Sequence, residues 1–262
     1  MKLRLVGLSM NMVMRMIAGK RYFGGATEGR GEEGEEFKEL MREVFELSAT
    51  SNPVDFLPVL KWVDFSGLEK RMSLILAGTD TTAATIEWGM SLLLNHPEIL
   101  DKARAEIDNA VGNSRLVQES DCIDLPYLQC IIKETFRLYP VGPLLIPHQS
   151  SEDCTVGGYF VSKETMLFVN TWAIHRDPTV WEDPTRFWPE RHSEAEGNPY
   201  RLAVSVALGT LIQCFEWKRA GEEILDMTEG PGLSMPKLVP LEALCKPRKF
   251  MEDVLINMQG DK

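Results

Sequence analysis

The chain has 262 residues, of which 44% are hydrophobic and 26% are charged, and its formal net charge is -11. A chain of this length can bury roughly 70–75% of its unfolded surface, and its charged fraction is that of globular proteins, so wholesale disorder is excluded. The acidic balance argues against nucleic-acid partners and against docking on an anionic membrane surface, because both require cations to meet phosphates.

The cysteines indicate an intracellular, reduced protein. They are odd in number and form no CxxC pair, which argues against a disulfide framework and against structural zinc. The favoured interpretation is that each is an ordinary small apolar side chain. The five are Cys122, Cys130, Cys154, Cys214 and Cys245.

The N-terminal part, residues 1–71, is expected to contain early helices and a loop. Residues 3–17 are helical in character, and Lys2 and Arg4 before them resemble the start of a signal peptide. Polar residues interrupt the apolar stretch, so a Met-rich buried helix is the favoured interpretation. The glycines within 29–34 match a dinucleotide fingerprint by letter only, because no strand precedes them and the surrounding glutamates would repel a pyrophosphate.

The remaining chain is predicted to be mainly α with a small β portion. The predicted helices share apolar positions at helical spacing and proline or glycine at their ends, and they cover 68–94, 98–111, 126–139 and 203–217. The predicted strands are short and follow turn signals, at 155–156, 159–161 and 166–170. An irregular packed loop is expected over 177–192 and small hairpins beyond residue 224.

The first candidate site lies in the middle of the long predicted helix. There Ala77, Gly78, Asp80 and Thr81 belong to a segment whose composition conflicts with helix propensity, and such conflicts often mark functional sites. The two small residues leave room for a ligand against the backbone, and an acid beside a hydroxyl can relay protons to it. An equally open alternative is a helix that back-bonded threonines bend.

The second candidate is the pair Glu134 and Arg137, three residues apart on one helix face. Most such pairs are surface features of less than about 1 kcal/mol. Here the neighbouring residues are apolar, so the pair is expected to be partly buried and to need further partners. The segment 187–192, which includes Arg191, is the candidate partner.

Taken in order, these pieces carry a resemblance to a known family. Ala-Gly-x-Asp-Thr-Thr, then Glu-x-x-Arg, then Pro-Glu-Arg resembles the signature of the cytochrome P-450 superfamily of haem-thiolate monooxygenases. Each motif is weak alone, but the three in order are specific. The flanking segments 88–97, 124–128 and 170–177 are similar to the plant microsomal branch, near the isoflavone and flavonoid hydroxylases.

The resemblance implies roles for the first candidate site. Asp80 and Thr81 correspond to the acid–alcohol pair that delivers protons, and Ala77 and Gly78 to the helix groove where oxygen sits. His148 corresponds to a position that in many relatives hydrogen-bonds a haem propionate, and a solvated turn residue is an equally open alternative.

The resemblance also implies that Glu134, Arg137 and Arg191 form a buried charge triad with a structural role. It also implies that the chain is a single partial domain over 1–262. Within it, residues 72–150 run from the oxygen-binding helix to the Glu-x-x-Arg helix. Residues 151–262 then hold the strands, the meander loop, the last helix and the C-terminal hairpins.

The sequence departs from the family at the iron ligand. The family's loop, Phe-x-x-Gly-x-Arg-x-Cys-x-Gly, supplies the cysteine thiolate that binds haem iron. Here residues 200–202 run directly into 203–209, and Cys214 corresponds to the end of the final helix. No residue is therefore assigned as a metal ligand. The family's N-terminal half with its membrane anchor is also expected to be missing, and a splice is expected between Met72 and Ser73.

Two functional hypotheses follow. By family, the chain is a haem-dependent monooxygenase that hydroxylates a flavonoid-like or other small aromatic substrate, with electrons that NADPH supplies through a reductase. Alternatively, it is an inactive remnant or interaction fragment with a marginal fold. The family implies the endoplasmic reticulum membrane, whereas a chain without the anchor is expected in the cytoplasm.

Overall fold

The computed structural model describes residues 68–194, 203–232 and 234–251, with side-chain surroundings from Asp80 onward. The helices expected in the N-terminal part, including that over 3–17, lie outside the described residues. The expected splice at 72–73 lies within an unbroken stretch of helix.

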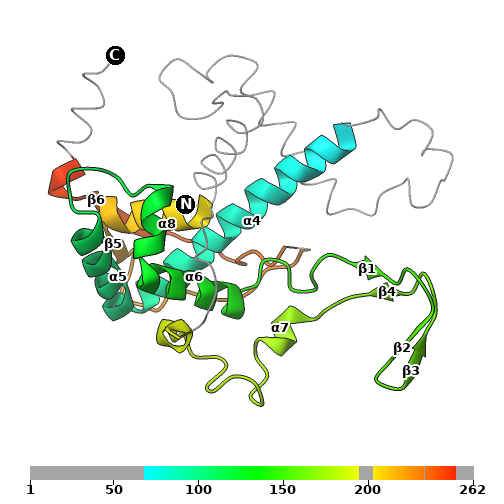
Figure 1. The fold of residues 1–262 in the computed structure, drawn as a ribbon. Helices are drawn as coiled ribbons and strands as arrows, with labels where there is room; N and C mark the ends of the chain where they lie inside the picture. The colour runs from blue at the N-terminus through cyan, green and yellow to red at the C-terminus, as the bar shows by residue number, and fades with distance from the viewer. Residues whose placement is uncertain (1–67, 195–202, 233, 252–262) are drawn as a thin grey trace.

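Long helices form the body of the described part of the chain. They are α4 (Leu68–Asn95), α5 (Pro97–Ala110), α6 (Pro126–Leu138) and α8 (Ala203–Cys214). Figure 1 shows α5, α6 and α8 gathered at the C-terminal end of α4, whose N-terminal end extends away from them. Shorter helical turns are η2 (Glu119–Asp124), α7 (Thr171–Ile174) and η3 (Pro189–His192).

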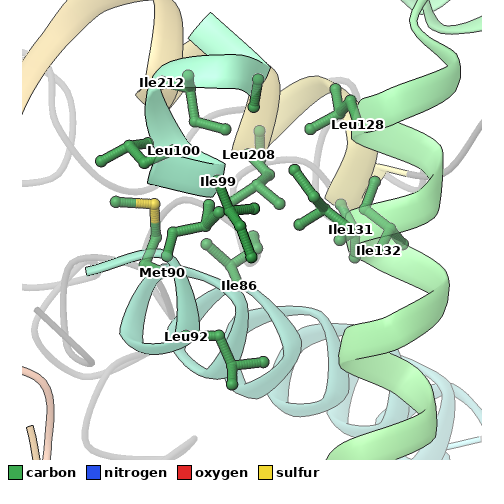
Figure 2. Packing of buried hydrophobic residues seen from close by; sticks show 14 of the residues in the cluster. Ile86, Met90, Leu92, Ile99, Leu100, Leu128, Ile131, Ile132, Leu208 and Ile212 are labelled. Atoms are coloured by element: carbon green, nitrogen blue, oxygen red, sulfur yellow. The ribbon is translucent and has the colours of Figure 1, made fainter. Parts of the chain in front are cut away.

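The hydrophobic core lies where these four helices meet. Each helix contributes apolar side chains, and Figure 2 shows Ile86, Ile99, Ile131 and Leu208 converging from the four helices. The fully buried residues at this junction include Ile86, Met90, Ile131, Ile132 and Leu208. Burying a side chain of this size stabilises the fold by about 1.5–3 kcal/mol, so this junction supplies the main apolar contribution to folding.

The strands form three antiparallel pairs of two strands each in the described residues. The pairs are β1 (His148–Gln149) with β4 (Met166–Leu167), β2 (Cys154–Val156) with β3 (Tyr159–Val161), and β5 (Phe215–Arg219) with β6 (Ala243–Pro247). A turn joins β2 to β3, and both of its central residues, Gly157 and Gly158, have a positive φ. Glycine suits these positions because it adopts a positive φ without strain.

The prediction of one helix over 203–217 was wrong at its C-terminal end. The helix stops at Cys214, and the next five residues form β5. Phe215 and Trp217 are less exposed than their neighbours, which is the alternation of a strand. Pairing with β6, a segment far along the chain, therefore overrides the local helical pattern.

The segment between α6 and α7 exposes many apolar side chains. Leu145, Ile146, Tyr159 and Phe160 are each about half exposed or more, and Ile146 and Tyr159 reach 79%. Exposed apolar groups in such number are unusual for a monomeric soluble protein. None of the helices in the described part of the chain combines the length and apolarity needed to span a bilayer.

A buried glutamine fastens the end of α8 to the loop after α5. The side-chain amide of Gln213 is fully buried, accepts from the Val117 N–H (3.0 Å) and donates to the carbonyls of Gly112 (3.0 Å) and Arg115 (2.9 Å). One side chain thus satisfies three backbone groups that the loop could not pair by itself.

We expect Gln213→Leu to destabilise the chain by about 2–4 kcal/mol, because it leaves three backbone groups without their partners. Urea unfolding followed by tryptophan fluorescence measures this change. Gln149→Leu is the control, since the Gln149 amide is exposed and donates one 3.3 Å bond. An equal loss in both variants would contradict the role of the buried amide.

Candidate functional site

A fully buried carboxylate, that of Glu134 on α6, is the centre of the most densely bonded polar cluster described. Arg137 donates to both of its oxygens at 2.8 Å. Arg191 donates to Oε1 at 3.1 Å, and the Trp188 N–H donates to the same oxygen at 3.0 Å. The structure therefore brings together Glu134, Arg137 and Arg191, the three residues of the second candidate.

The two arginines also connect this cluster, through hydrogen bonds, to the backbone of the loop that follows α7. Arg137 donates from one nitrogen to the carbonyls of His175 and Pro184, each at 2.6 Å. Arg191 donates to the carbonyl of Glu182 at 2.7 Å. Backbone groups of the irregular loop are thus satisfied by side chains, which is how a loop without regular structure remains packed.

A fourth side chain, His192, belongs to the cluster although the sequence pattern did not single it out. Its Nε2 lies 2.9 Å from Glu134 Oε2. Burial by itself would raise the pKa of Glu134, but hydrogen bonds from Arg137, His192 and the Trp188 N–H lower it to about 2. Glu134 is therefore an ionised acceptor at neutral pH, and Nε2 of His192 carries the proton of their bond.

The first candidate site lies on α4. Ala77 and Gly78 lie in the helix just before Asp80, and Asp80 and Thr81 are partly buried. The Asp80 carboxylate accepts a 2.5 Å hydrogen bond from the hydroxyl of Ser234, which is 154 residues away in sequence. Thr85, one turn after Thr81, donates to the Thr81 carbonyl at 2.8 Å, so back-bonding by a threonine also occurs in this helix.

Ser234 belongs to a hairpin that packs along α4. The Gly230 N–H donates to the Pro236 carbonyl at 2.7 Å, and a bridge joins Glu229 to Lys237 across it. Nothing in the sequence pattern pointed to Ser234, because its contact with Asp80 depends entirely on tertiary folding.

His148 lies apart from both clusters. It begins β1, in the extended part of the molecule beyond the helical body, and its side chain is exposed. The structure therefore does not bring His148 into the Glu134 cluster, and a haem-propionate role for it stays a prediction.

Three of the cysteines are buried. Cys130 and Cys214 are buried, and burial raises the pKa of both thiols, that of Cys214 to about 11. Cys122 is also buried, and its thiol donates to the Gln118 carbonyl. Thiolate ligation requires the opposite environment, one that favours the anion.

The two other cysteines are exposed. Cys154 and Cys245 lie on β2 and β6, on opposite sides of the molecule in Figure 1. Within the described ranges, no group of three or more His, Cys, Asp or Glu side chains is arranged to hold a metal ion. The described residues therefore offer no multidentate metal site, and their buried thiols lie in surroundings that favour the neutral form.

Comparison with known proteins identifies the class to which this fold and these clusters belong. The family model "Cytochrome P450" matches residues 68–203, which include α4, α6 and the Glu134 cluster. The match covers more than half of the chain. The chain belongs to the cytochrome P450 family, and its mainly α fold is a partial form of that family's fold.

Plant relatives narrow the family further. Cytochrome P450 81Q32 of Catharanthus roseus is 45% identical over 97% of this chain and 65% of its own length. An isoflavone 3'-hydroxylase of Medicago truncatula is 40% identical over 96% of this chain and 65% of its own length. The chain thus spans slightly less than two thirds of these relatives. The alignment with cytochrome P450 81Q32 is 325 positions long. Because this chain has 262 residues, the alignment includes positions at which the relative has a residue and this chain has a gap.

A solved structure agrees at the level of the fold. A zebrafish cytochrome P450 determined with progesterone has a TM-score of 0.72 and 24% identity, and the match covers 95% of this chain and 71% of that one. The arrangement of α4, α5, α6 and α8 is therefore that of the family.

We expect Glu134→Gln to destabilise the chain by about 3–5 kcal/mol at pH 7, because the guanidiniums of Arg137 and Arg191 lose the charge that compensates them. Urea unfolding measures the change. Asp101→Asn is a matched control: Asp101 pairs with Arg104, also three residues away on one helix, at 2.7 Å, and the Asp101 side chain is exposed, so the cost should stay below about 1 kcal/mol.

The low pKa of Glu134 also predicts an acid dependence of stability. The folded-state pKa of about 2 lies below the ordinary 4.5, so the carboxylate contributes stability that is present above pH 4.5 and is lost as pH falls toward 2. The stability difference between wild type and Glu134→Gln, measured by urea unfolding at several pH values, should narrow over this range. A difference that stays constant would contradict an ionised Glu134.

Proposed function

We propose that this chain is the helical core of a cytochrome P450 of the aromatic-hydroxylating type, and that its 262 residues do not hydroxylate a substrate by themselves. The observation that carries the first part is the buried Glu134 carboxylate, which joins Arg137 on α6 to Arg191 in the loop after α7. This is the charge triad that the resemblance to haem-thiolate monooxygenases implies.

The substrate class is proposed from the relatives. Two relatives from Medicago truncatula are hydroxylases of isoflavones. The isoflavone 3'-hydroxylase is 40% identical to this chain, and the isoflavone 2'-hydroxylase is 36% identical. A flavonoid-like or other small aromatic substrate is consistent with these relatives. Electrons from NADPH through a reductase and a location at the endoplasmic reticulum membrane are further parts of the proposal.

We propose that Asp80 and Thr81 on α4 hold and pass protons, and that Ala77 and Gly78 provide the groove beside them. His148 is proposed to contact a haem propionate. These roles rest on the family motif and on the position of the four α4 residues within one stretch of about one and a half helical turns.

The second part of the proposal rests on the cysteines. Haem activates oxygen in this family when a thiolate binds the iron, and in this chain the buried thiols are held in the neutral form. A non-catalytic role is therefore the second candidate function. The exposed apolar side chains between α6 and α7, such as Ile146 and Tyr159, favour it because they suit association with another surface.

A carbon monoxide difference spectrum tests the proposal. The chain of 262 residues, expressed with haem supplied and then reduced, should show no thiolate-type Soret band when carbon monoxide is added. A thiolate-type band would contradict the proposal that the chain lacks a usable iron ligand.

A matched pair of insertions sharpens this test. A loop of the pattern Phe-x-x-Gly-x-Arg-x-Cys-x-Gly is placed between Leu202 and Ala203, with and without a cysteine-to-serine change in the inserted loop. A band with the cysteine and none with the serine is the expected result. Sequencing the transcript across this junction and across Met72–Ser73 then shows whether the natural message contains such a loop.

A further inference from the structure

We propose that Ser234 is a positioning residue for Asp80: its hydroxyl fixes the Asp80 carboxylate, and the hairpin around residues 225–241 brings it there. The inference rests on the proposed proton-delivery role of Asp80. It assigns a part of this site to a segment that lies 154 residues farther along the chain.

The hairpin is held on α4 by contacts that do not involve Ser234. Asn95 exchanges two hydrogen bonds with the backbone of Leu225, at 3.1 and 2.9 Å. Trp88 donates from its indole N–H to the Met235 carbonyl at 2.8 Å. The N–H of Leu241 donates to the buried carboxylate of Glu87 at 2.8 Å.

A buried lysine reinforces these contacts. The ammonium of Lys237 lies 4.7 Å from the centre of the Trp88 ring and donates to the Asp226 carbonyl. The side chain is buried, and a buried ammonium is stable only with such partners. The hairpin is thus fixed at both of its arms, and its turn can reach only a limited part of α4.

The turn of the hairpin reaches Asp80. Gly230 and Gly232 permit it: a side chain at Gly230 would lie 3.3 Å from the backbone of Leu238, and Gly232 has a φ of +143°. The backbone at Gly232 is one that side chains rarely adopt, and at Gly230 a side chain would be tightly placed. Ser234 stands two positions after Gly232 in the sequence, and its hydroxyl lies 2.5 Å from Asp80 Oδ2.

The chemistry of this bond suits positioning. A hydroxyl that donates to a carboxylate forms a short, charge-assisted hydrogen bond, stronger than one between neutral groups. It engages one carboxylate oxygen, Oδ2, so the second oxygen is not used by this bond. The Ser234 hydroxyl also keeps acceptor capacity of its own, and because Ser234 is half-buried, solvent can reach it.

The experiment measures hydrogen exchange at the Met235 amide, which follows Ser234 and donates to the Val141 carbonyl at 3.2 Å. Ser234→Ala and Asp80→Ala should each speed its exchange by about tenfold, the effect of one lost hydrogen bond to a charged group. The double variant should exchange no faster than either single variant, because all three lack the same bond.

Two further variants separate positioning from a general loosening of the hairpin. Ser234→Thr keeps the hydroxyl and should restore slow exchange. Thr228→Ala removes a comparable hydroxyl–carboxylate bond in the same hairpin, that from Thr228 to Asp226 (2.6 Å), and should leave the Met235 amide unchanged.

Three results would overturn the inference: wild-type exchange at Met235 as fast as in an unstructured peptide, no change in Ser234→Ala, or additive effects in the double variant. The measurement uses the chain without haem. If the chain with the inserted cysteine loop shows no thiolate-type Soret band, that result counts against the proposed function. It does not affect the exchange measurement, which tests Ser234 independently.

Discussion

The burial of one carboxylate, that of Glu134, is the constraint on which most of the described structure depends. An ionised carboxylate taken out of water is tolerated only when charges and donors surround it. Here two arginines, a histidine and a backbone N–H meet that requirement. Arg137 also donates to carbonyls of the loop at 175–186. The side chain that compensates the Glu134 charge therefore also holds this loop in place.

A stack of rings and cations connects this cluster to the Asp80 site. Tyr139, at the end of α6, lies parallel to Trp88 of α4 with ring centres 3.9 Å apart. Arg176 lies near the rings of Tyr139 and Trp172 and pairs with Glu229 of the hairpin at 3.1 Å. The loop ordered by Glu134 and the hairpin that carries Ser234 are therefore joined by contacts between the C-terminal end of α6 and the C-terminal half of α4.

The sequence predicted the helices well where local signals mark their ends. Pro97 and Pro126 each stand at the first position of a helix, where the missing N–H has no cost, and the predicted boundaries there agree with the structure within one residue. Local signals did not reveal β5, since its pairing partner follows more than twenty residues later. The same limit applies to the site: a motif indicated Glu134, whereas Ser234 has no motif.

The cysteines show why a sound fold does not by itself supply the chemistry of the family. Cys214 is a buried thiol beside a cation, Arg248, which acts to lower the pKa of the thiol. That guanidinium is already paired through both terminal nitrogens with Asp108, at 2.9 and 2.7 Å. Its charge is therefore largely compensated, burial dominates, and the Cys214 thiol stays protonated. Helix packing and the charge cluster make no use of a thiolate, so the described fold does not depend on one.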